Sequence, residues 1–318
     1  MRIGILGLGK MGANMARRLA RANIEVVGFN RSQDVVNSLA KEKVIIPAAS
    51  LAEVIAKLPV PRVIWSMLPC GDPTEEAITQ LAPLLSKGDV IVDGGNSNYH
   101  DSERRGAMLA KQGIGFMDAG TSGGIWGLEN GYCLMVGGTT ETVAVLTPVL
   151  KALAPAPDRG WAHVGPVGAG HYTKMIHNGI EYGMMQAYAE GFTLLCKKEK
   201  FSLDLAQISE LWRHSSVVRS WLLDLTAQAM KVDAADTSKP AQKPDQLLDA
   251  LSPYVEDSGE GRWTVIEAIE QGVAAPVITM ALQMRFASRD KEGYGYRLLS
   301  LMRKAFGGHV APKLDKPS

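Results

Sequence analysis

The sequence predicts an α/β domain with a parallel sheet, followed by an all-α domain. In the first half, short apolar runs alternate with helical segments, and a glycine-rich turn follows the first run. Strands and helices that alternate at this spacing indicate a parallel sheet with crossover helices. The second half shows only long helical periodicity. We expect the two domains at residues 1–165 and 166–318.

The apolar runs of the first half predict strands at residues 2–6, 24–30, 62–68, 89–95, 114–120 and 132–138. The segments between them predict helices at residues 13–22, 31–42, 75–85, 102–113 and 141–153. A stretch rich in proline and glycine, residues 154–168, marks the domain boundary. Helical periodicity then covers residues 168–198, 203–230, 262–289 and 293–306. We expect a loop at residues 231–246 and disorder after His309.

Composition excludes several classes of protein. Lys and Arg total 34 and Asp and Glu total 33, so a net charge of +1 argues against a broad nucleic-acid or anionic-membrane surface. Three widely spaced cysteines form no disulfide framework and no metal-binding pair, which favours a reducing compartment. The N-terminus lacks a signal-peptide pattern, and no apolar run reaches the ~18 residues that span a bilayer. We therefore expect a cytoplasmic protein.

The turn after the first predicted strand has the spacing G-x-G-x-x-G, formed by Gly7, Gly9 and Gly12. The first glycine permits a tight turn, the second lets the backbone approach a pyrophosphate, and the third lets helix and strand pack closely. A glycine-rich turn without a ligand is the alternative. The strand–turn–helix context favours a Rossmann-type dinucleotide-binding domain.

The end of the second predicted strand indicates which dinucleotide binds. Enzymes that use NAD usually carry Asp or Glu there, which accepts bonds from the ribose 2′-hydroxyl. This chain has Asn30, Arg31 and Ser32 instead. A guanidinium group suits the 2′-phosphate of NADP, whereas stacking of Arg31 on adenine would serve either cofactor. We therefore expect NADP, with NAD as the alternative.

Four polar residues share one face of the predicted helix over residues 168–198. Lys174, His177, Asn178 and Glu181 lie at i, i+3, i+4 and i+7. A solvated surface face is the alternative, but two mid-helix glycines cost about 1 kcal/mol each and permit a close approach. The pattern favours an acid–base site that removes a hydroxyl proton as hydride leaves, with the glutamate acting at a second carbon.

At this point the chain resembles the decarboxylating 6-phosphogluconate dehydrogenase family over nearly its whole length, in a short form. The motifs that carry the resemblance are GLGKMG (7–12), NRS (30–32), DGGNS (93–97), SGG (122–124), Lys174 with HNGIEYGMMQ (177–186), and RKAFGGH (303–309).

The resemblance implies how the substrate reacts. Lys174 would deprotonate the 3-hydroxyl while C3 gives hydride to the nicotinamide, and the 3-keto acid would then lose CO2. Glu181 would protonate C1 of the enediol to give ribulose 5-phosphate. His177 and Asn178 would contact substrate hydroxyls. The carboxylate end would be held by Ser122, Gly123 and Gly124.

The resemblance also implies which residues bind the two anionic ligands. The substrate phosphate would be held by Tyr182, Arg285 and Arg303, with His309 nearby. Asn96 would lie between nicotinamide and substrate. The cofactor would be bound by Gly7, Leu8, Gly9, Lys10, Met11, Gly12, Asn30, Arg31, Ser32, Leu68, Pro69, Cys70 and Asn96. The C-terminal segment would complete the site of a partner subunit in a homodimer or homotetramer. No metal is expected, because oxidation itself creates a β-keto acid.

The sequence departs from the longer members of the family before Trp263. Those members have roughly Lys-Gly-Thr-Gly-Lys-Trp, whereas this chain has Ser-Gly-Glu-Gly-Arg-Trp at residues 258–263. A β-hydroxyacid dehydrogenase of the 3-hydroxyisobutyrate type is the enzymatic alternative, and a non-catalytic NADP-binding sensor is the other. Both the pentose phosphate pathway and gluconate breakdown remain open as the route served.

Overall fold

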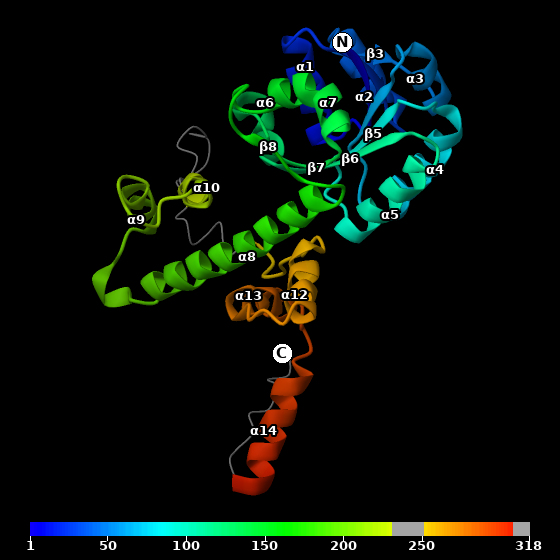
Figure 1. Cartoon of the computed structure of the whole chain (residues 1–318). Coiled ribbons are helices and arrows are strands. Elements are labelled where there is room, and N and C mark those ends of the chain that lie inside the picture. The colour runs from blue at the N-terminus through cyan, green and yellow to red at the C-terminus, as the bar shows by residue number, and fades with distance from the viewer. Residues whose placement is uncertain (231–250, 308–318) are drawn as a thin grey trace. The chain divides into compact units, whose positions relative to one another are not determined.

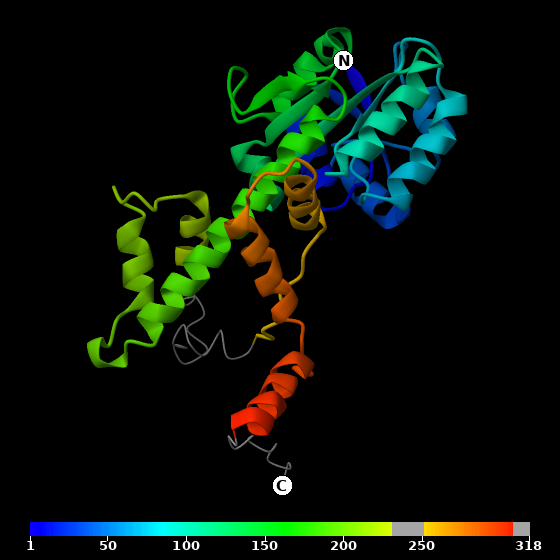
Figure 2. The same cartoon turned by 60° about the horizontal axis from the view of Figure 1, so that its bottom comes forward.

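The computed structural model describes residues 1–230 and 251–307, which form two compact units (Figures 1 and 2). The first unit covers Met1–Gly179 and the second begins at Ile180. The predicted loop at 231–246, the tail and His309 lie outside the described residues. No helix in the described ranges is both long and apolar enough to cross a membrane.

The first unit is built on one sheet with the strand order β3-β2-β1-β4-β5-β6-β7-β8. Its strands are β1 (Arg2–Leu6), β2 (Glu25–Phe29), β3 (Ile46–Pro47), β4 (Val63–Ser66), β5 (Val90–Asp93), β6 (Gly115–Ser122), β7 (Cys133–Gly138) and β8 (Trp161–Gly165). The chain crosses from β3 back over β1 to β4, so the strand order reverses between β1 and β4. Ligands of open α/β sheets bind outside the carboxyl ends of strands at such a switch point.

All six predicted strands are present, and the Rossmann-type fold with a helical second part is confirmed. The expectation of a parallel sheet needs one correction, because β7 runs antiparallel to β6. Only a short connection joins these two strands, and a parallel pair needs a long crossover. The sequence also missed β3, which has two residues, and β8, which lies in the stretch rich in proline and glycine.

Helices cover both faces of this sheet, and alternate strand residues supply one core on each face. The helices of the first unit are α1 (Lys10–Arg21), α2 (Gln33–Lys41), α3 (Leu51–Lys57), α4 (Asp72–Leu81), α5 (Tyr99–Ala110), α6 (Gly127–Asn130) and α7 (Thr140–Leu153), with 3-10 turns η1 (Ala82–Leu84) and η2 (Gly124–Trp126). One core packs α1, α2 and α7 against strand residues such as Ile5 and Val92. The opposite core packs α3, α4 and α5 against residues such as Leu6 and Ile91.

Local sequence signals set several helix starts. Ser50 caps α3 by accepting a bond from the Glu53 amide (3.1 Å), while the Glu53 carboxylate accepts the Ala49 amide (2.7 Å). Asn98 caps α5 by accepting the His100 amide at 3.0 Å. The sequence analysis missed α3, a helix of only seven residues.

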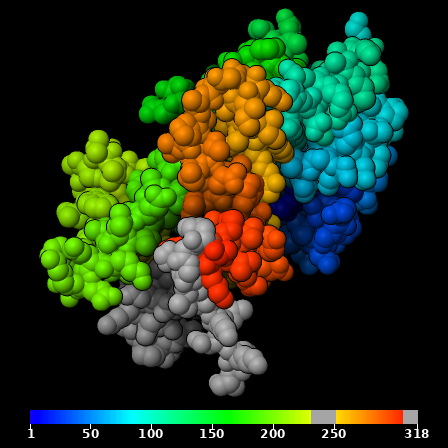
Figure 3. Space-filling model, turned by 90° about the horizontal axis from the view of Figure 1, so that it is seen from below, coloured from blue at the N-terminus to red at the C-terminus, as the bar shows by residue number. Residues whose placement is uncertain are grey.

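The long helix α8 (Ala169–Cys196) runs from the first unit into the second. The second unit then contains η3 (Glu199–Phe201), α9 (Leu205–Trp212), α10 (Trp221–Met230), α12 (Glu260–Glu270), α13 (Pro276–Ala287) and α14 (Tyr294–Gly307). The predicted helix at 203–230 is divided into α9 and α10, and that at 262–289 into α12 and α13. In the space-filling view of Figure 3, the atoms of α12 and α13 are orange and those of α14 are red.

Candidate active site

The glycine-rich loop between β1 and α1 has the geometry that its sequence predicts. Gly7 has φ of +85°, a conformation that favours glycine. A Cβ on Gly12 would lie 2.0 Å from the Gly7 carbonyl oxygen, so helix and loop touch there. Gly9 precedes α1, where a Cβ would meet nothing within 4 Å and no side chain caps the helix. The exposed N–H groups at the start of α1 therefore fit a pyrophosphate.

Asn30 supports this loop from the end of β2. Its Oδ1 accepts a hydrogen bond from the Leu8 amide at 3.1 Å. The neighbouring Arg31 is exposed and makes no hydrogen bond or ion pair within residues 1–230 and 251–307. Ser32 precedes α2 without capping it through its side chain. The guanidinium and the hydroxyl are therefore the groups here that are available to a ligand.

The loop after β4 lies at the other side of the switch point and carries Leu68, Pro69 and Cys70. The Pro69 carbonyl accepts a bond from the Thr74 hydroxyl at 2.7 Å. A Cβ on Gly95 would lie 2.3 Å from the Leu68 carbonyl oxygen, so the loops after β4 and β5 touch.

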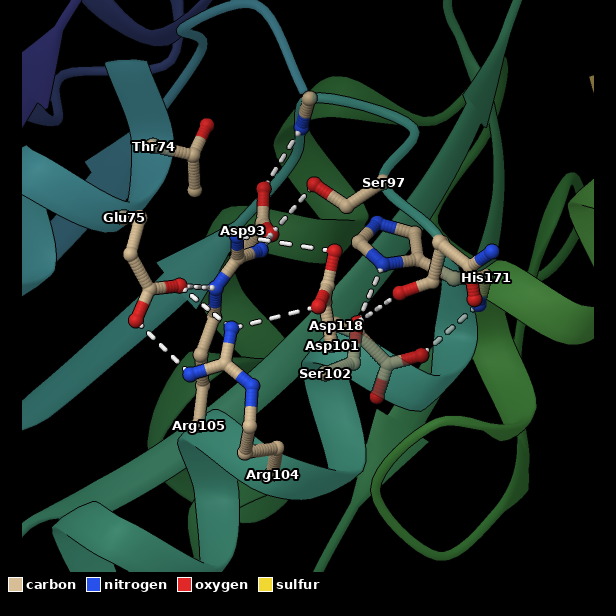
Figure 4. A network of polar contacts seen from close by, with 12 residues as sticks. Thr74, Glu75, Asp93, Ser97, Asp101, Ser102, Arg104, Arg105, Asp118 and His171 are labelled. Atoms are coloured by element: carbon tan, nitrogen blue, oxygen red, sulfur yellow. Dashed lines mark hydrogen bonds and ion pairs between the residues drawn. The ribbon is translucent and has the colours of Figure 1, made fainter. Parts of the chain in front are cut away.

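A buried ion-pair network holds the loop after β5 (Figure 4). Asp93 is fully buried, and its carboxylate accepts bonds from the Gly95 amide (3.0 Å) and the Ser97 hydroxyl (2.7 Å). Arg105 of α5 is also buried and donates to Asp93 at 3.1 Å and to Glu75 at 2.8 Å. Hydrogen bonds from Arg104 and Arg105 lower the pKa of Glu75 to about 2. The network fixes the backbone on both sides of Asn96.

Asn96 connects this loop to β6. Its Nδ2 donates to the Thr121 carbonyl at 3.0 Å, and its Oδ1 accepts the Thr121 amide at 2.8 Å. Asn96 has φ of +52°, in the left-handed region that asparagine tolerates. Asn96 therefore uses both polar atoms of its side chain to hold the backbone of Thr121, the residue before Ser122.

The turn at Ser122, Gly123 and Gly124 requires glycine. Gly123 has φ of +125° and Gly124 has φ of +52°. A Cβ on Gly124 would meet nothing within 4 Å, so its backbone faces open space. Such a turn can present a hydroxyl and backbone N–H groups to an anion.

The first turns of α8 pack against β6 and carry the predicted base. Lys174 is 5% exposed, and its Nζ donates to Asn178 Oδ1 and lies 3.5 Å from His177 Nδ1. A Cβ on Gly120 would lie 2.4 Å from Lys174 Cβ, so only a glycine leaves room for the lysine stem. Glu181, half-buried, follows one turn after His177 along the same helix.

In the second unit, Arg285 stacks on Tyr182. The guanidinium carbon lies 3.5 Å from the ring centroid, and Nη1 donates to the Glu256 carbonyl at 2.7 Å. A Cβ on Gly261 would lie 2.3 Å from Tyr182 Cε2, so that glycine lets α12 reach the ring. Tyr182 is 5% exposed and packs against Leu282.

Arg262, which stands at the departure from the longer members, is paired with a carboxylate. Asp257 accepts bonds from Arg262 Nε (2.8 Å) and Arg289 Nη2 (2.7 Å). These bonds lower the pKa of Asp257 to about 2, with Arg262 as the larger cause. Arg303 lies exposed on α14. The structure therefore joins Tyr182 and Arg285, and within residues 1–230 and 251–307 no hydrogen bond or ion pair joins Arg303 to either of them.

Sequence reasoning missed the residues that support this site. Asp93 and Asp118 lie at strand positions where an apolar pattern continues, and their partners are distant in sequence. Arg105 and His171 fall within the helices predicted at residues 102–113 and 168–198, and no pattern distinguishes either of them from its neighbours. The sequence signal that could have indicated such a residue is an acidic side chain at the C-terminal end of an apolar strand, as at Asp93.

Both parts of the chain match models of one protein family. Residues 2–165 match the family model described as the NAD binding domain of 6-phosphogluconate dehydrogenase, and residues 170–313 match its C-terminal domain. An NAD(+)-dependent, decarboxylating 6-phosphogluconate dehydrogenase of Haloferax volcanii is 39% identical over 99% of this chain and 100% of its own length.

Solved structures give the same result. A Plasmodium falciparum 6-phosphogluconate dehydrogenase, described with NADP+ and with 6-phosphogluconate, matches 100% of this chain and 67% of that one, at a TM-score of 0.81 and 26% identity. A Mycobacterium tuberculosis 3-hydroxyisobutyrate dehydrogenase shares the fold at a TM-score of 0.68 and 23% identity, covering 91% of this chain and 94% of that one. The chain belongs to the 6-phosphogluconate dehydrogenase family.

Proposed function

We propose that the protein oxidises and decarboxylates 6-phospho-D-gluconate to D-ribulose 5-phosphate and CO2, reducing NADP or NAD. The observation that carries this proposal is the buried Lys174, which is bonded to Asn178 beside the strand that leads into the Ser122 turn. A lysine in that place can take a proton from a hydroxyl of a substrate whose carboxylate lies at the turn.

Lys174 accepts the proton of the 3-hydroxyl while hydride leaves C3. The bound dinucleotide supplies the hydride acceptor. Asn178 and His177 orient the Lys174 amine and contact substrate hydroxyls, which fits their positions at the lysine Nζ. Proton and hydride together leave a ketone at C3.

Loss of CO2 follows because the carboxylate is then β to a ketone. The Ser122 hydroxyl and the N–H groups of Gly123 and Gly124 hold the carboxylate, and the open space at Gly124 supports this role. Electrons of the C1–C2 bond form the C2–C3 double bond as CO2 departs, and protonated Lys174 returns its proton to the C3 oxygen, which gives an enediol. Glu181 then donates a proton to the enediol carbon that was C2 of the substrate and becomes C1 of ribulose 5-phosphate, while Lys174 takes back the hydroxyl proton. The place of Glu181 on the same helix as Lys174 supports that assignment.

Arg285 and Tyr182 would bind the phosphate, with Arg303 and His309 contributed by the C-terminal segment. Arg285 stacks on Tyr182 and has no ion pair to a described residue, so its charge is not neutralised. A guanidinium in this state is suited to phosphate.

NADP is the proposed preferred cofactor, and NAD is the alternative. The exposed guanidinium of Arg31 beside Ser32 supports NADP, because only NADP carries a 2′-phosphate. Leu8, Lys10 and Met11 of the loop, and Leu68, Pro69 and Cys70 opposite, would line the remainder of the cofactor site.

The proposal includes a division of labour and an assembly. Residues 1–165 would bind the dinucleotide, and residues 166–318 would bind substrate and form a cytoplasmic homodimer or homotetramer. Large exposed apolar side chains in the second unit support self-association, among them Leu194 (74%), Val277 (68%) and Leu211 (65%). The reaction fits either pentose phosphate metabolism or gluconate breakdown.

Initial rates with two acids test the proposal. Purified protein is supplied with 6-phosphogluconate or 3-hydroxyisobutyrate, each with NADP and with NAD, and reduced cofactor is followed by absorbance. We expect turnover of 6-phosphogluconate alone. Turnover of 3-hydroxyisobutyrate with no response to 6-phosphogluconate would establish the β-hydroxyacid alternative, and cofactor binding without turnover of either would favour a sensor.

A further inference from the structure

A buried carboxylate of β6, Asp118, holds the start of α8. Asp118 is fully buried, and its Oδ1 accepts the Gly168 amide and its Oδ2 the His171 amide, each at 2.7 Å. Gly168 directly precedes α8, and His171 is the third residue of the helix. These are N–H groups that a helix leaves without an intrahelical acceptor. The cap of α8 is therefore supplied by a strand fifty residues earlier in the chain.

The same turn of α8 is held on its other side. The Ser102 hydroxyl of α5 lies 2.8 Å from His171 Nδ1, as Figure 4 shows. His171 is 1% exposed, and its Nε2 has no hydrogen-bond partner within the described ranges. The first turn of α8 is thus fixed between β6 and α5.

Close packing leaves this turn no freedom to shift. A Cβ on Gly170 would lie 2.4 Å from the Met135 carbonyl oxygen, and one on Gly137 would lie 2.5 Å from Asp118 Oδ1. The backbone of α8 at Gly170 is therefore in close contact with the backbones of β6 and β7. Lys174 follows one turn after Gly170 and rests its stem on Gly120 in the same contact.

From these contacts we infer that Asp118 is a positioning residue for Lys174: it fixes the first turn of α8, and so the amine, relative to the Ser122 turn. This inference rests on the proposed function, because Lys174 is the base only in that reaction. Asp118 is two strand positions before Gly120 and four before Ser122. Strand β6 therefore anchors the helix that carries the proposed base, Lys174. The same strand leads into the Ser122 turn, which is proposed to hold the substrate carboxylate.

The charge state of Asp118 is consistent with this role. Burial raises the pKa of Asp118, while the charge of His171 and the N–H groups of Gly168 and His171 oppose that rise. Both oxygens act as acceptors, which is the hydrogen bonding of an ionised carboxylate.

The test compares Asp118→Asn with Asp89→Asn. The asparagine at 118 keeps one acceptor and turns an NH2 group toward the second backbone N–H, so the helix start must move. Asp89 is a matched control, because it is also fully buried and also accepts two backbone amides, from Arg62 (2.6 Å) and Ser86 (2.8 Å), but it lies at the amino end of the central strand β5.

We expect Asp118→Asn to lower kcat about 10- to 100-fold, as small misplacements of catalytic groups do, with KM for NADP within about twofold of the parent value. Asp89→Asn is expected to lower Tm while kcat stays near the parent value. Deuterium uptake of residues 166–175 should rise in Asp118→Asn and not in Asp89→Asn. Should Asp118→Asn not fold, Asp118→Glu carries the same test, since it moves the carboxylate by one methylene.

Parent-like kcat in a folded Asp118 variant, or an equal loss of kcat in Asp89→Asn, would overturn the inference. A parent enzyme that does not oxidise 6-phosphogluconate would overturn the proposed function instead. Deuterium uptake still decides in that case whether Asp118 anchors α8, because it needs no activity.

Discussion

Glu75 in the first unit and Asp257 in the second each lie between two arginines, and the two arrangements have different consequences. Glu75 in the first unit accepts bonds from Arg104 and Arg105, and Arg105 continues to Asp93 and the Asn96 loop. Asp257 in the second unit accepts bonds from Arg262 and Arg289. The carboxylate in each case has a pKa of about 2.

The two units differ in whether an arginine near the carboxylate remains available to bind a ligand. In the first unit, the network ends on the Gly95 amide and the Ser97 hydroxyl and shapes a loop. In the second unit, Asp257 is ion-paired with both Arg262 and Arg289, whereas Arg285 has no ion pair to a described residue. In the proposed reaction, the first unit thus fixes the geometry of the reacting groups, and Arg285 of the second unit is the cation available to the substrate phosphate. Substitutions can separate these two contributions.

The largest effect is expected where the first unit supplies chemistry. Lys174→Met keeps the buried stem and removes the amine, so kcat should fall about 10²- to 10⁴-fold while NADP binding persists. Fluorescence titration with NADP and steady-state rates measure the two quantities. Lys57→Met is the matched control, since Lys57 pairs with Glu53 on the partly exposed α3. A kcat within tenfold of the parent value would remove Lys174 as the base.

Next in size is the loss of phosphate affinity in the second unit. Arg285→Met should raise KM for 6-phosphogluconate about 10- to 100-fold, because a charged hydrogen-bond donor to phosphate is lost. Arg262→Met should lower Tm and change this KM little, because Arg262 is already ion-paired with Asp257. Michaelis curves for both variants decide the point. A larger rise of KM in Arg262→Met would reverse the roles of the two arginines.

A smaller, selective effect is expected at the cofactor. Arg31→Ala should lower kcat/KM for NADP about tenfold or more and leave that for NAD nearly unchanged, because the 2′-phosphate loses its counter-charge. Arg159→Ala serves as the control, since Arg159 is exposed and pairs with its neighbour Asp158. Equal losses for both cofactors would show that Arg31 contacts a part that NAD and NADP share.

The smallest expected effect is on thermal stability and on how that stability changes with pH. The pKa of Asp257 is lowered from 3.8 to about 2, so its ionised form stabilises the fold above pH 4, and this contribution is lost as pH falls toward 2. Asp257→Asn should lower Tm by a few degrees, roughly 2–4 °C at pH 7. Thermal melts should show that difference shrinking between pH 4 and pH 2. A difference that stays constant with pH would deny Asp257 this role.

The sequence predicted the features that depend on residues close to one another in the chain. The strand positions, the glycine-rich loop and the shared face of Lys174 and Asn178 all follow from spacing within a few residues. The two-residue β3, the direction of β7 and the break between α9 and α10 depend on tertiary packing. No local pattern encodes them.

The supporting residues of the site were beyond sequence reasoning for the same reason. Asp118 is bonded to an amide fifty residues away, and Asn96 to one twenty-five residues away. Their roles depend on which strand ends meet at one edge of the sheet. The pairing of Arg262 with Asp257 is likewise set by tertiary contacts, and no sequence pattern predicts it.

In the proposed reaction, the enzyme couples hydride transfer from C3 to the loss of C1 as CO2. The most direct measurement follows reduced cofactor by absorbance and released CO2 by a coupled or isotopic assay in one reaction with 6-phosphogluconate. We predict one CO2 for each reduced cofactor throughout the time course. Reduced cofactor without stoichiometric CO2 would contradict this coupling.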